Sequence, residues 1–266
     1  MKIIINADDF GKTQSINKAI CYCFEKGFIT NTTLMVNMPF ADEAVRLAKE
    51  NGFWDKVGIH LNLTEGIPLN KELQNSKLFC DENGVFKGTY QELLLSRFLL
   101  SKKLRREIDT EIELQLQKFL SYKPDYLHLD SHHHVHTDWS ILRELKPLFI
   151  KYSFSSIRLS KNLNVTGSFI NRILKNFYKN IYNAKLERIT KKHTDLFCDF
   201  EDYLLLQNDF LKNKTFYDNK TLELMCHPDF IDEKLKNLWT GNGDAENFKK
   251  VSVFFKEHNL ISYKDL

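Results

Sequence analysis

The chain has 266 residues, of which 42% are hydrophobic and 27% are charged, an ordinary globular composition that excludes a disordered, collagen-like or coiled-coil protein. The 38 Lys and Arg residues nearly balance the 35 Asp and Glu residues, so the net charge of +3 gives no indication of a nucleic-acid partner. Length alone leaves one or two domains open, because α/β barrels of about 250 residues form single domains.

The cysteine content and the length of the hydrophobic runs indicate the cellular compartment of the protein. The five cysteines are odd in number and show no CxxC spacing, so we expect neither a disulfide framework nor a thiolate zinc site. This usage is typical of a reducing compartment. The apolar run at residues 3–5 is too short for a signal peptide, and no run reaches the roughly 18 apolar residues of a membrane helix. We therefore expect a cytoplasmic protein with no membrane partner.

The first part of the chain alternates between strand-like and helix-like patterns. Strand-like runs occupy residues 2–7, 28–37 and 57–63, and helical apolar spacing occupies residues 15–25 and 41–50. Three such units in succession favour a parallel sheet or barrel.

The pattern weakens over residues 66–98, where the turn sequence DENG indicates an insertion folded over one end of the sheet. A Lys/Asn-rich stretch at 161–193 has helical apolar spacing and is interpreted as a second insertion. The remaining expected elements are a helix over 104–122 and strands over 126–130, 156–159 and 221–226. No repeat, low-complexity tract or linker divides the chain, which favours a single catalytic domain over residues 1–266.

Polar side chains that packing does not require gather where the expected strands end. Asp8 and Asp9 follow the first strand, His60 and Asn62 end the third, Asp130, His132, His133, His134 and His136 follow the fourth, and His227 and Asp229 follow the last. Ligands of parallel α/β folds bind at the carboxyl ends of the strands. The pattern therefore predicts one site formed by four strand ends.

Structural roles are the alternatives to this functional interpretation. Asp8 or Asp9 could cap a helix, and His60 could be a hydrogen-bonded core residue. Four histidines within positions 132–136 are hard to explain by packing, and imidazole is the commonest metal ligand, so we expect at least one to bind a metal. His227 is ambiguous by itself.

The residue types also favour a reaction class. One carboxylate and two imidazoles leave positions open for water and substrate on a divalent ion, which polarises a carbonyl and acidifies bound water. A second carboxylate could accept a proton from that water, and a further histidine could donate one to the leaving group. Hydrolysis of an amide or ester is therefore expected.

Five sequence blocks occur in order along the chain: NADDFG at 6–11, TNTTLMVN at 30–37, GIHLNLTEGIPL at 58–69, HLDSHHHVH at 128–136 and ELMCHPD at 223–229. Together they resemble the YdjC-like carbohydrate deacetylases, the family that includes chitooligosaccharide deacetylase. The resemblance implies an α/β fold, a distorted (β/α) barrel of the polysaccharide-deacetylase-like type with loop insertions. It also implies one divalent metal ion, Mg²⁺ or Zn²⁺, and removal of acetyl groups from N-acetylated mono- or oligosaccharides.

The same resemblance implies roles for single residues. Asp9, His60 and His132 would be the metal ligands, Asp8 the catalytic base and His227 the catalytic acid. Arg158 would lie near the site and orient Asp8, with a surface arginine as the alternative. Residues expected to support these groups or to face the substrate are Asp130, Asn62, His134 and His136, together with Arg158 and His133.

Two further functions stay open on sequence grounds. One is a metal-dependent phosphoesterase on a similar barrel, although a two-metal site would need additional bridging carboxylates. The other is a noncatalytic sugar-binding relative, against which the presence of Asp8 and His227 counts.

The substrate is the part that the sequence leaves most open, because residues 159–193 depart from the family pattern. We expect residues 66–98 and 161–193 to shape the cleft, since the loops of a barrel carry specificity. The expected partner is a small carbohydrate, and self-association into a homodimer stays open.

Overall fold

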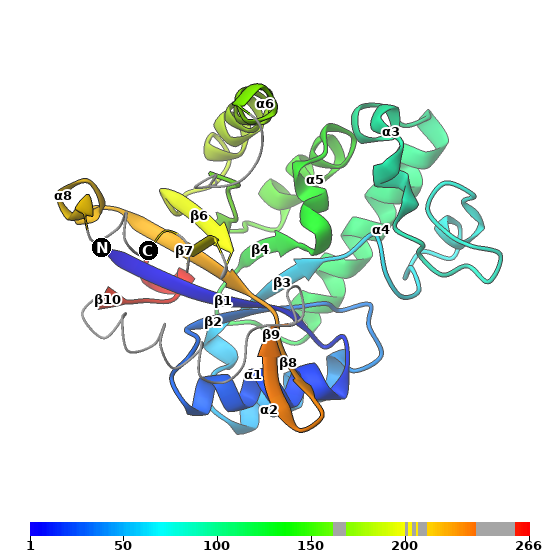
Figure 1. Ribbon diagram of the computed structural model, residues 1–266. Coiled ribbons are helices and arrows are strands. Elements are labelled where there is room, and N and C mark those ends of the chain that lie inside the picture. Colours follow the sequence, from blue (N-terminus) through cyan, green and yellow to red (C-terminus); the bar gives the residue numbers. More distant parts are fainter. Residues whose placement is uncertain (162–168, 200–201, 204–205, 207–211, 238–258) are drawn as a thin grey trace.

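The computed structural model describes residues 1–161, 169–199, 202–203, 206, 212–237 and 259–266. Its centre is a parallel sheet with the strand order β5-β4-β3-β2-β1-β7-β6. The strands are β1 (Lys2–Phe10), β2 (Asn31–Leu34), β3 (Val57–Leu61), β4 (His128–Ser131), β5 (Ser156–Ile157), β6 (Leu196–Asp199) and β7 (Thr221–Cys226), and β10 (Asn259–Leu260) pairs with the start of β1. Figure 1 shows that this sheet curls into a half-barrel surrounded by helices, which confirms the expected single-domain, distorted α/β barrel.

Helices follow most of the strands and cover the sheet. They are α1 (Gln14–Glu25), α2 (Ala41–Glu50), α3 (Leu94–Phe98), α4 (Lys102–Ser121), α5 (Trp139–Lys151), α6 (Phe169–Glu187) and α8 (Lys214–Tyr217). In the view of Figure 1, α1 and α2 lie below the sheet and α5 and α6 above it. None of the helices in the described part of the chain is long and apolar enough to cross a membrane.

The core forms because β1 is buried on both faces, as is usual for a central parallel strand. Ile3, Ile4 and Ile5 have no exposed surface, and Ile16 and Ile20 of α1 pack in the main apolar cluster with Ile3 and Ile5. Burying an isoleucine side chain contributes about 1.5–3 kcal/mol. The apolar core therefore fixes β1, and with it the residues at its carboxyl end.

The segment 66–98 packs against the helices beside the sheet. It contains short 3₁₀ helices at Leu73–Asn75 and Thr89–Glu92 before α3, and α3 contacts α5. Asn70 anchors it to α4, because its backbone N–H donates to Glu111 Oε2 at 2.6 Å. The helix expected within 161–193 is α6, whereas residues 162–168 of that stretch lie outside the described residues.

Several predicted boundaries were wrong. β1 runs to Phe10, so Asp8 and Asp9 belong to the strand, and neither caps a helix because Thr13 is the N-cap of α1. The strand expected over 28–37 is limited to β2. The sequence pattern does not predict α5, which contains an internal Pro147, nor β6, nor the antiparallel hairpin of β8 (Pro228–Ile231) and β9 (Lys234–Asn237).

Gly58 in β3 allows close approach to β4. A Cβ atom at this position would lie 2.9 Å from His128 Cδ2 and 3.0 Å from the His128 carbonyl oxygen. We expect Gly58→Ala to lower the free energy of unfolding by about 1–3 kcal/mol, because β3 cannot move away without disturbing its ladder with β4. Urea denaturation measures this change, and an unaltered midpoint and slope would contradict it.

Candidate active site

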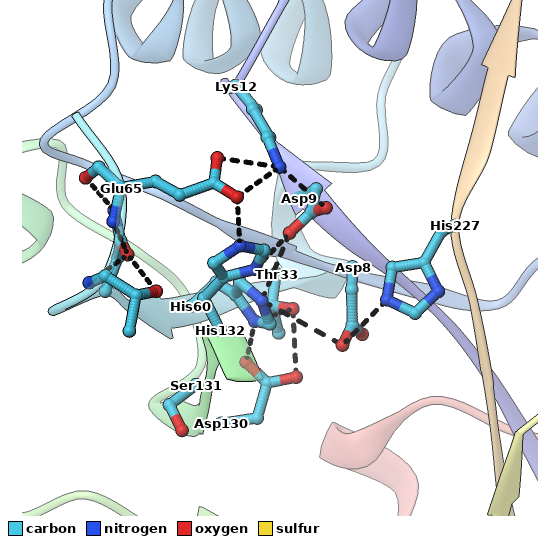
Figure 2. Close-up of polar contacts among 12 residues, drawn as sticks. Asp8, Asp9, Lys12, Thr33, His60, Glu65, Asp130, Ser131, His132 and His227 are labelled. Atoms are coloured by element: carbon cyan, nitrogen blue, oxygen red, sulfur yellow. Dashed lines mark hydrogen bonds and ion pairs between the residues drawn. The ribbon is translucent and has the colours of Figure 1, made fainter. Parts of the chain in front are cut away.

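Two adjacent carboxylates at the end of β1 reach the same histidine. Successive side chains of a regular strand point to opposite faces, but the register of β1 against β2 shifts between Ala7 and Phe10, and Asp9 has a φ of 69°. His60 Nε2 consequently lies 3.4 Å from Asp9 Oδ1 and 3.9 Å from Asp8 Oδ2. The bulge brings both acids to one site, as Figure 2 shows.

His60 is oriented by the neighbouring strand. It pairs with Asp130 in the parallel register of β3 and β4, and its Nδ1 lies 2.6 Å from Asp130 Oδ1. Thr33 donates to the other Asp130 oxygen at 3.0 Å. Burial lowers the pKa of His60, but Asp130 and Asp8 outweigh this effect and raise it to about 10. The carboxylates therefore favour a positive charge at the imidazole, whose Nε2 faces Asp9.

His132 stands at the start of a strained turn after β4, the 3₁₀ segment His132–Thr137. His133 and His134 have φ values of 50° and 55°, which are uncommon for residues other than glycine. Such backbone conformations cost of order 1–3 kcal/mol each and cluster at functional sites. The turn places His132 Nδ1 2.8 Å from Asp9 Oδ1, and it places His132 Nε2 3.0 Å from Glu65 Oε1.

Three of these side chains fit a metal ion. In the described part of the chain, Asp9 Oδ1 is buried 2.8 Å from His132 Nδ1 and 3.4 Å from His60 Nε2, and neither contact has the geometry of a hydrogen bond. Each of these three residues offers one ligand atom, and the three atoms lie within 4.8 Å of one another. A cation bound between these atoms would satisfy them better than their present contacts do. One carboxylate and two imidazoles form a donor set suited to a divalent ion.

Arg158, directly after β5, is fully buried, so the surface alternative for this residue was wrong. Its two terminal nitrogens each lie 2.7 Å from one oxygen of Asp8, a bidentate pair. It also contacts Asp130 at 2.8 Å and Glu223 at 2.7 Å. Burial raises the pKa of Asp8, but the charge and hydrogen bonds of Arg158 outweigh it and hold this pKa well below its usual range. Asp8 is therefore ionised and fixed in orientation.

His227 lies on the other side of Asp8 from His60 (Figure 2), between β7 and β8. Its Nε2 is 3.9 Å from Asp8 Oδ2, and the residue is 7% exposed. Burial lowers the pKa of His227, and the nearby carboxylates act in the opposite direction. The imidazole is thus held in a setting that disfavours its charged form.

The side chain of Asn62 makes hydrogen bonds to the loop that follows β3. Its side-chain amide donates to the Glu65 carbonyl oxygen at 2.7 Å, and its Oδ1 accepts from the backbone N–H groups of Thr64 and Glu65. These bonds shape the loop after β3.

His134 and His136 line the turn after β4. His136 Nδ1 contacts the Ser131 hydroxyl, and its Nε2 lies 3.1 Å from the Arg158 carbonyl oxygen. His134 meets the Phe197 ring edge to face at 5.8 Å. Both lie beside the cluster, and neither shares in the Asp9, His60 and His132 group.

The sequence analysis missed two charged residues of the cluster. Lys12 Nζ lies 2.8 Å from Glu65 and 3.7 Å from Asp9 Oδ2, and Glu65 in turn contacts His132. The hydrogen bond from His132 is the largest of the effects that lower the pKa of Glu65 to about 2. Lys12 lies two residues after the end of β1 and Glu65 four residues after the end of β3, at the same edge of the sheet as Asp8 and His60. This position is the signal that could have found them.

The fold and the geometry define a class: a parallel α/β half-barrel whose strand ends gather carboxylates and imidazoles that could hold a metal. A family model described as YdjC-like protein matches residues 2–256. The chain therefore belongs to the YdjC-like family, as its motifs predicted.

Individual relatives agree with this assignment. The chain is 34% identical to a carbohydrate deacetylase of Clostridium beijerinckii, with full coverage of both chains. It is 30% identical to a carbohydrate deacetylase of Halalkalibacterium halodurans, over 89% of this chain and 88% of the relative. A crystal structure of a putative cellobiose-phosphate cleavage protein from Enterococcus faecalis superposes with a TM-score of 0.66 at 22% identity, covering 99% of this chain and 98% of that one. That likeness shows the fold alone.

The buried His136 makes a pH-dependent contribution to stability. Burial, followed by the charge of Arg158, lowers its pKa to about 3, whereas an unfolded imidazole titrates near 6.5. The folded state binds fewer protons in this window, so the contribution is complete above about pH 6.5 and is lost as the pH falls toward 3. We expect the free energy of unfolding to fall more steeply between pH 7 and pH 5 in the wild type than in His136→Gln, by up to about 1.4 kcal/mol per pH unit. Urea titrations at both pH values compare the slopes, and equal slopes would refute this role.

Proposed function

We propose that this protein removes the acetyl group from an N-acetylated sugar, releasing acetate and the amino sugar, with the help of one divalent ion. The observation that carries the proposal is the convergence of Asp9, His60 and His132 beside Asp8 and His227 at one edge of the sheet. Membership of the YdjC-like family and the deacetylase names of its relatives support the reaction class.

Asp9, His60 and His132 would hold the ion. When bound, it would supply Lewis acidity to the acetyl carbonyl and lower the pKa of a water molecule. The choice of metal follows from the donors: imidazole nitrogen suits Zn²⁺, whereas Mg²⁺ prefers oxygen ligands and retains several waters. We therefore favour Zn²⁺ over Mg²⁺.

Asp8 is the proposed base. It is ionised, buried and held bidentately by Arg158, so its orientation toward a water near His60 costs little entropy on reaction. The same pairing makes Asp8 a weak base. It therefore suits proton transfer from a water that is already acidified, with no need for a raised pKa.

His227 is the proposed acid. Because burial disfavours its charged form, it would carry its second proton only during the reaction. Asp8 Oδ2 lies 3.9 Å away, so a proton accepted by Asp8 could pass to His227 after a small movement and then to the leaving nitrogen. The attacking water thus loses one proton, and the amine gains it.

The two alternative functions, a metal-dependent phosphoesterase and a noncatalytic sugar-binding protein, have less support. Asp8 and Asp130, which a second bridging metal would need, are both paired with Arg158. A noncatalytic sugar-binding protein would need neither a proton acceptor nor a proton donor, whereas Asp8 and His227 lie 3.9 Å apart beside the proposed metal ligands. The roles of segments 66–98 and 161–193 in sugar preference, the homodimer and the cytoplasmic location stay predictions.

Acetate release is the direct test of the reaction. Purified protein supplied with Zn²⁺ or Mg²⁺ should release acetate from at least one member of a series of N-acetylated mono- and oligosaccharides. A generic phosphate monoester is the comparison substrate, and we expect no turnover of it. Phosphate release without acetate release would replace the proposed function by the phosphoesterase alternative.

Asp8→Asn and His227→Ala separate catalysis from metal binding. We expect each variant to bind Zn²⁺ nearly as well as the wild type but to lose about 10²–10⁴-fold in kcat, because a positioned acid or base is worth that factor. His193→Ala, whose histidine lies outside the cluster, is the matched control and should keep its activity. Near-normal turnover of His227→Ala would place the acid elsewhere, with His134 or His136 next to be tested.

His60→Ala and His132→Ala test the ligand set. After equilibration with Zn²⁺ and removal of free metal, elemental analysis should give close to one ion per chain for the wild type and His193→Ala. Each ligand variant should retain only a small fraction, because two remaining donors hold the ion weakly. Full occupancy in both ligand variants would remove the assignment.

A further inference from the structure

The carboxylate of Glu65 faces the nitrogen of His132 that points away from Asp9. Glu65 Oε1 lies 3.0 Å from His132 Nε2, whereas His132 Nδ1 lies 2.8 Å from Asp9 Oδ1. The imidazole therefore stands between two carboxylates from different strand ends, as Figure 2 shows.

The loop that carries Glu65 is held in place on both sides of this residue. Asn62 accepts a hydrogen bond from the Glu65 backbone N–H at 3.1 Å, and both Asn62 and Asn37 donate to its carbonyl oxygen. Lys12 Nζ lies 3.0 Å from Oε1 and 2.8 Å from Oε2 of the Glu65 side chain. The carboxylate is thus fixed by a salt bridge as well as by its backbone.

We propose that Glu65 is a positioning residue that sets the tautomer of His132. By accepting a hydrogen bond from the protonated Nε2 it leaves the lone pair of Nδ1 directed at Asp9, where the ion of the proposed function would bind. Lys12 holds Glu65 at the distance this requires. The inference rests on the proposed metal site and adds a residue outside its ligand set.

His60 provides an internal parallel for this arrangement. Its Nδ1 lies 2.6 Å from Asp130 Oδ1 while its Nε2 faces Asp9. Each of the two imidazoles therefore has a carboxylate on the side remote from Asp9, although opposite ring nitrogens face Asp9 in the two cases. The rings approach edge to face, with centroids 5.5 Å apart.

Glu65 and His132 also lie within reach of His133, so these three could in principle hold a second ion. The ammonium group of Lys12 already forms a salt bridge with the Glu65 carboxylate, and its positive charge repels a second cation at this position. We therefore assign Glu65 to orientation, and a second ion becomes an outcome of the test.

The test is calorimetric titration of Zn²⁺ into metal-free protein, combined with ¹⁵N NMR of the histidine rings. We expect Glu65→Ala to weaken Zn²⁺ binding about 10–100-fold, as loss of such a partner typically does. Glu65→Gln, which retains an oxygen acceptor, should lose less. Glu82→Ala, which replaces an exposed glutamate in the segment 66–98, is the matched control and should keep the wild-type Kd.

The NMR spectra report which ring nitrogen of His132 is protonated. Loss of a residue with a merely structural role would not change this. In the metal-free protein at alkaline pH, Asp9 and Glu65 compete for the single ring proton of His132, so the fraction of rings protonated at Nε2 should be lower in Glu65→Ala than in the wild type. If Glu65→Ala leaves both the Zn²⁺ affinity and the His132 tautomer unchanged, the inference about Glu65 is overturned but the proposed function is not. Two ions per wild-type chain and one per Glu65→Ala chain would make Glu65 a ligand and likewise overturn it. No Zn²⁺ binding by the wild type would instead contradict the proposed function.

Discussion

A single buried guanidinium organises the site. Arg158 has no exposed surface and contacts Asp8, Asp130 and Glu223, which come from β1, β4 and β7. Burying these charges is expensive, and only close pairing with additional hydrogen bonds compensates for it. Tyr263, near the C-terminal end of the chain, supplies one such bond to Glu223. Arg158 thus ties together strands on both sides of β1 and fixes the acids around the histidines.

The electrostatic consequence is a site that favours a cation. Arg158 neutralises part of the charge of its three carboxylates, whereas Asp9 faces His60 and His132. With Asp130 behind His60 and Glu65 behind His132, each imidazole is backed by an acid. This arrangement makes the ring nitrogens better donors toward a shared ion. The proposed chemistry therefore depends on charge balance as much as on the ligands themselves.

The strand ends were predictable from sequence because parallel strands bring their carboxyl ends to one edge, and polar residues there have no role in the core. The bulge at Asp9 could not be predicted from the sequence, because it depends on the register of β1 against β2, which no local sequence pattern encodes. Glu223 was missed for a related reason: inside a strand it resembles a solvent-facing residue, and only the non-local Arg158 explains its burial. The partnership of Lys12 with Glu65 likewise joins segments far apart in the chain.

The central claim is that one ion binds between Asp9, His60 and His132. Anomalous diffraction at the zinc edge, from crystals grown with Zn²⁺, tests it most directly. One strong peak should lie about 2.0–2.2 Å from Asp9 Oδ1, His60 Nε2 and His132 Nδ1. A fully ordered site with no peak there, or a peak held by other residues, would contradict it.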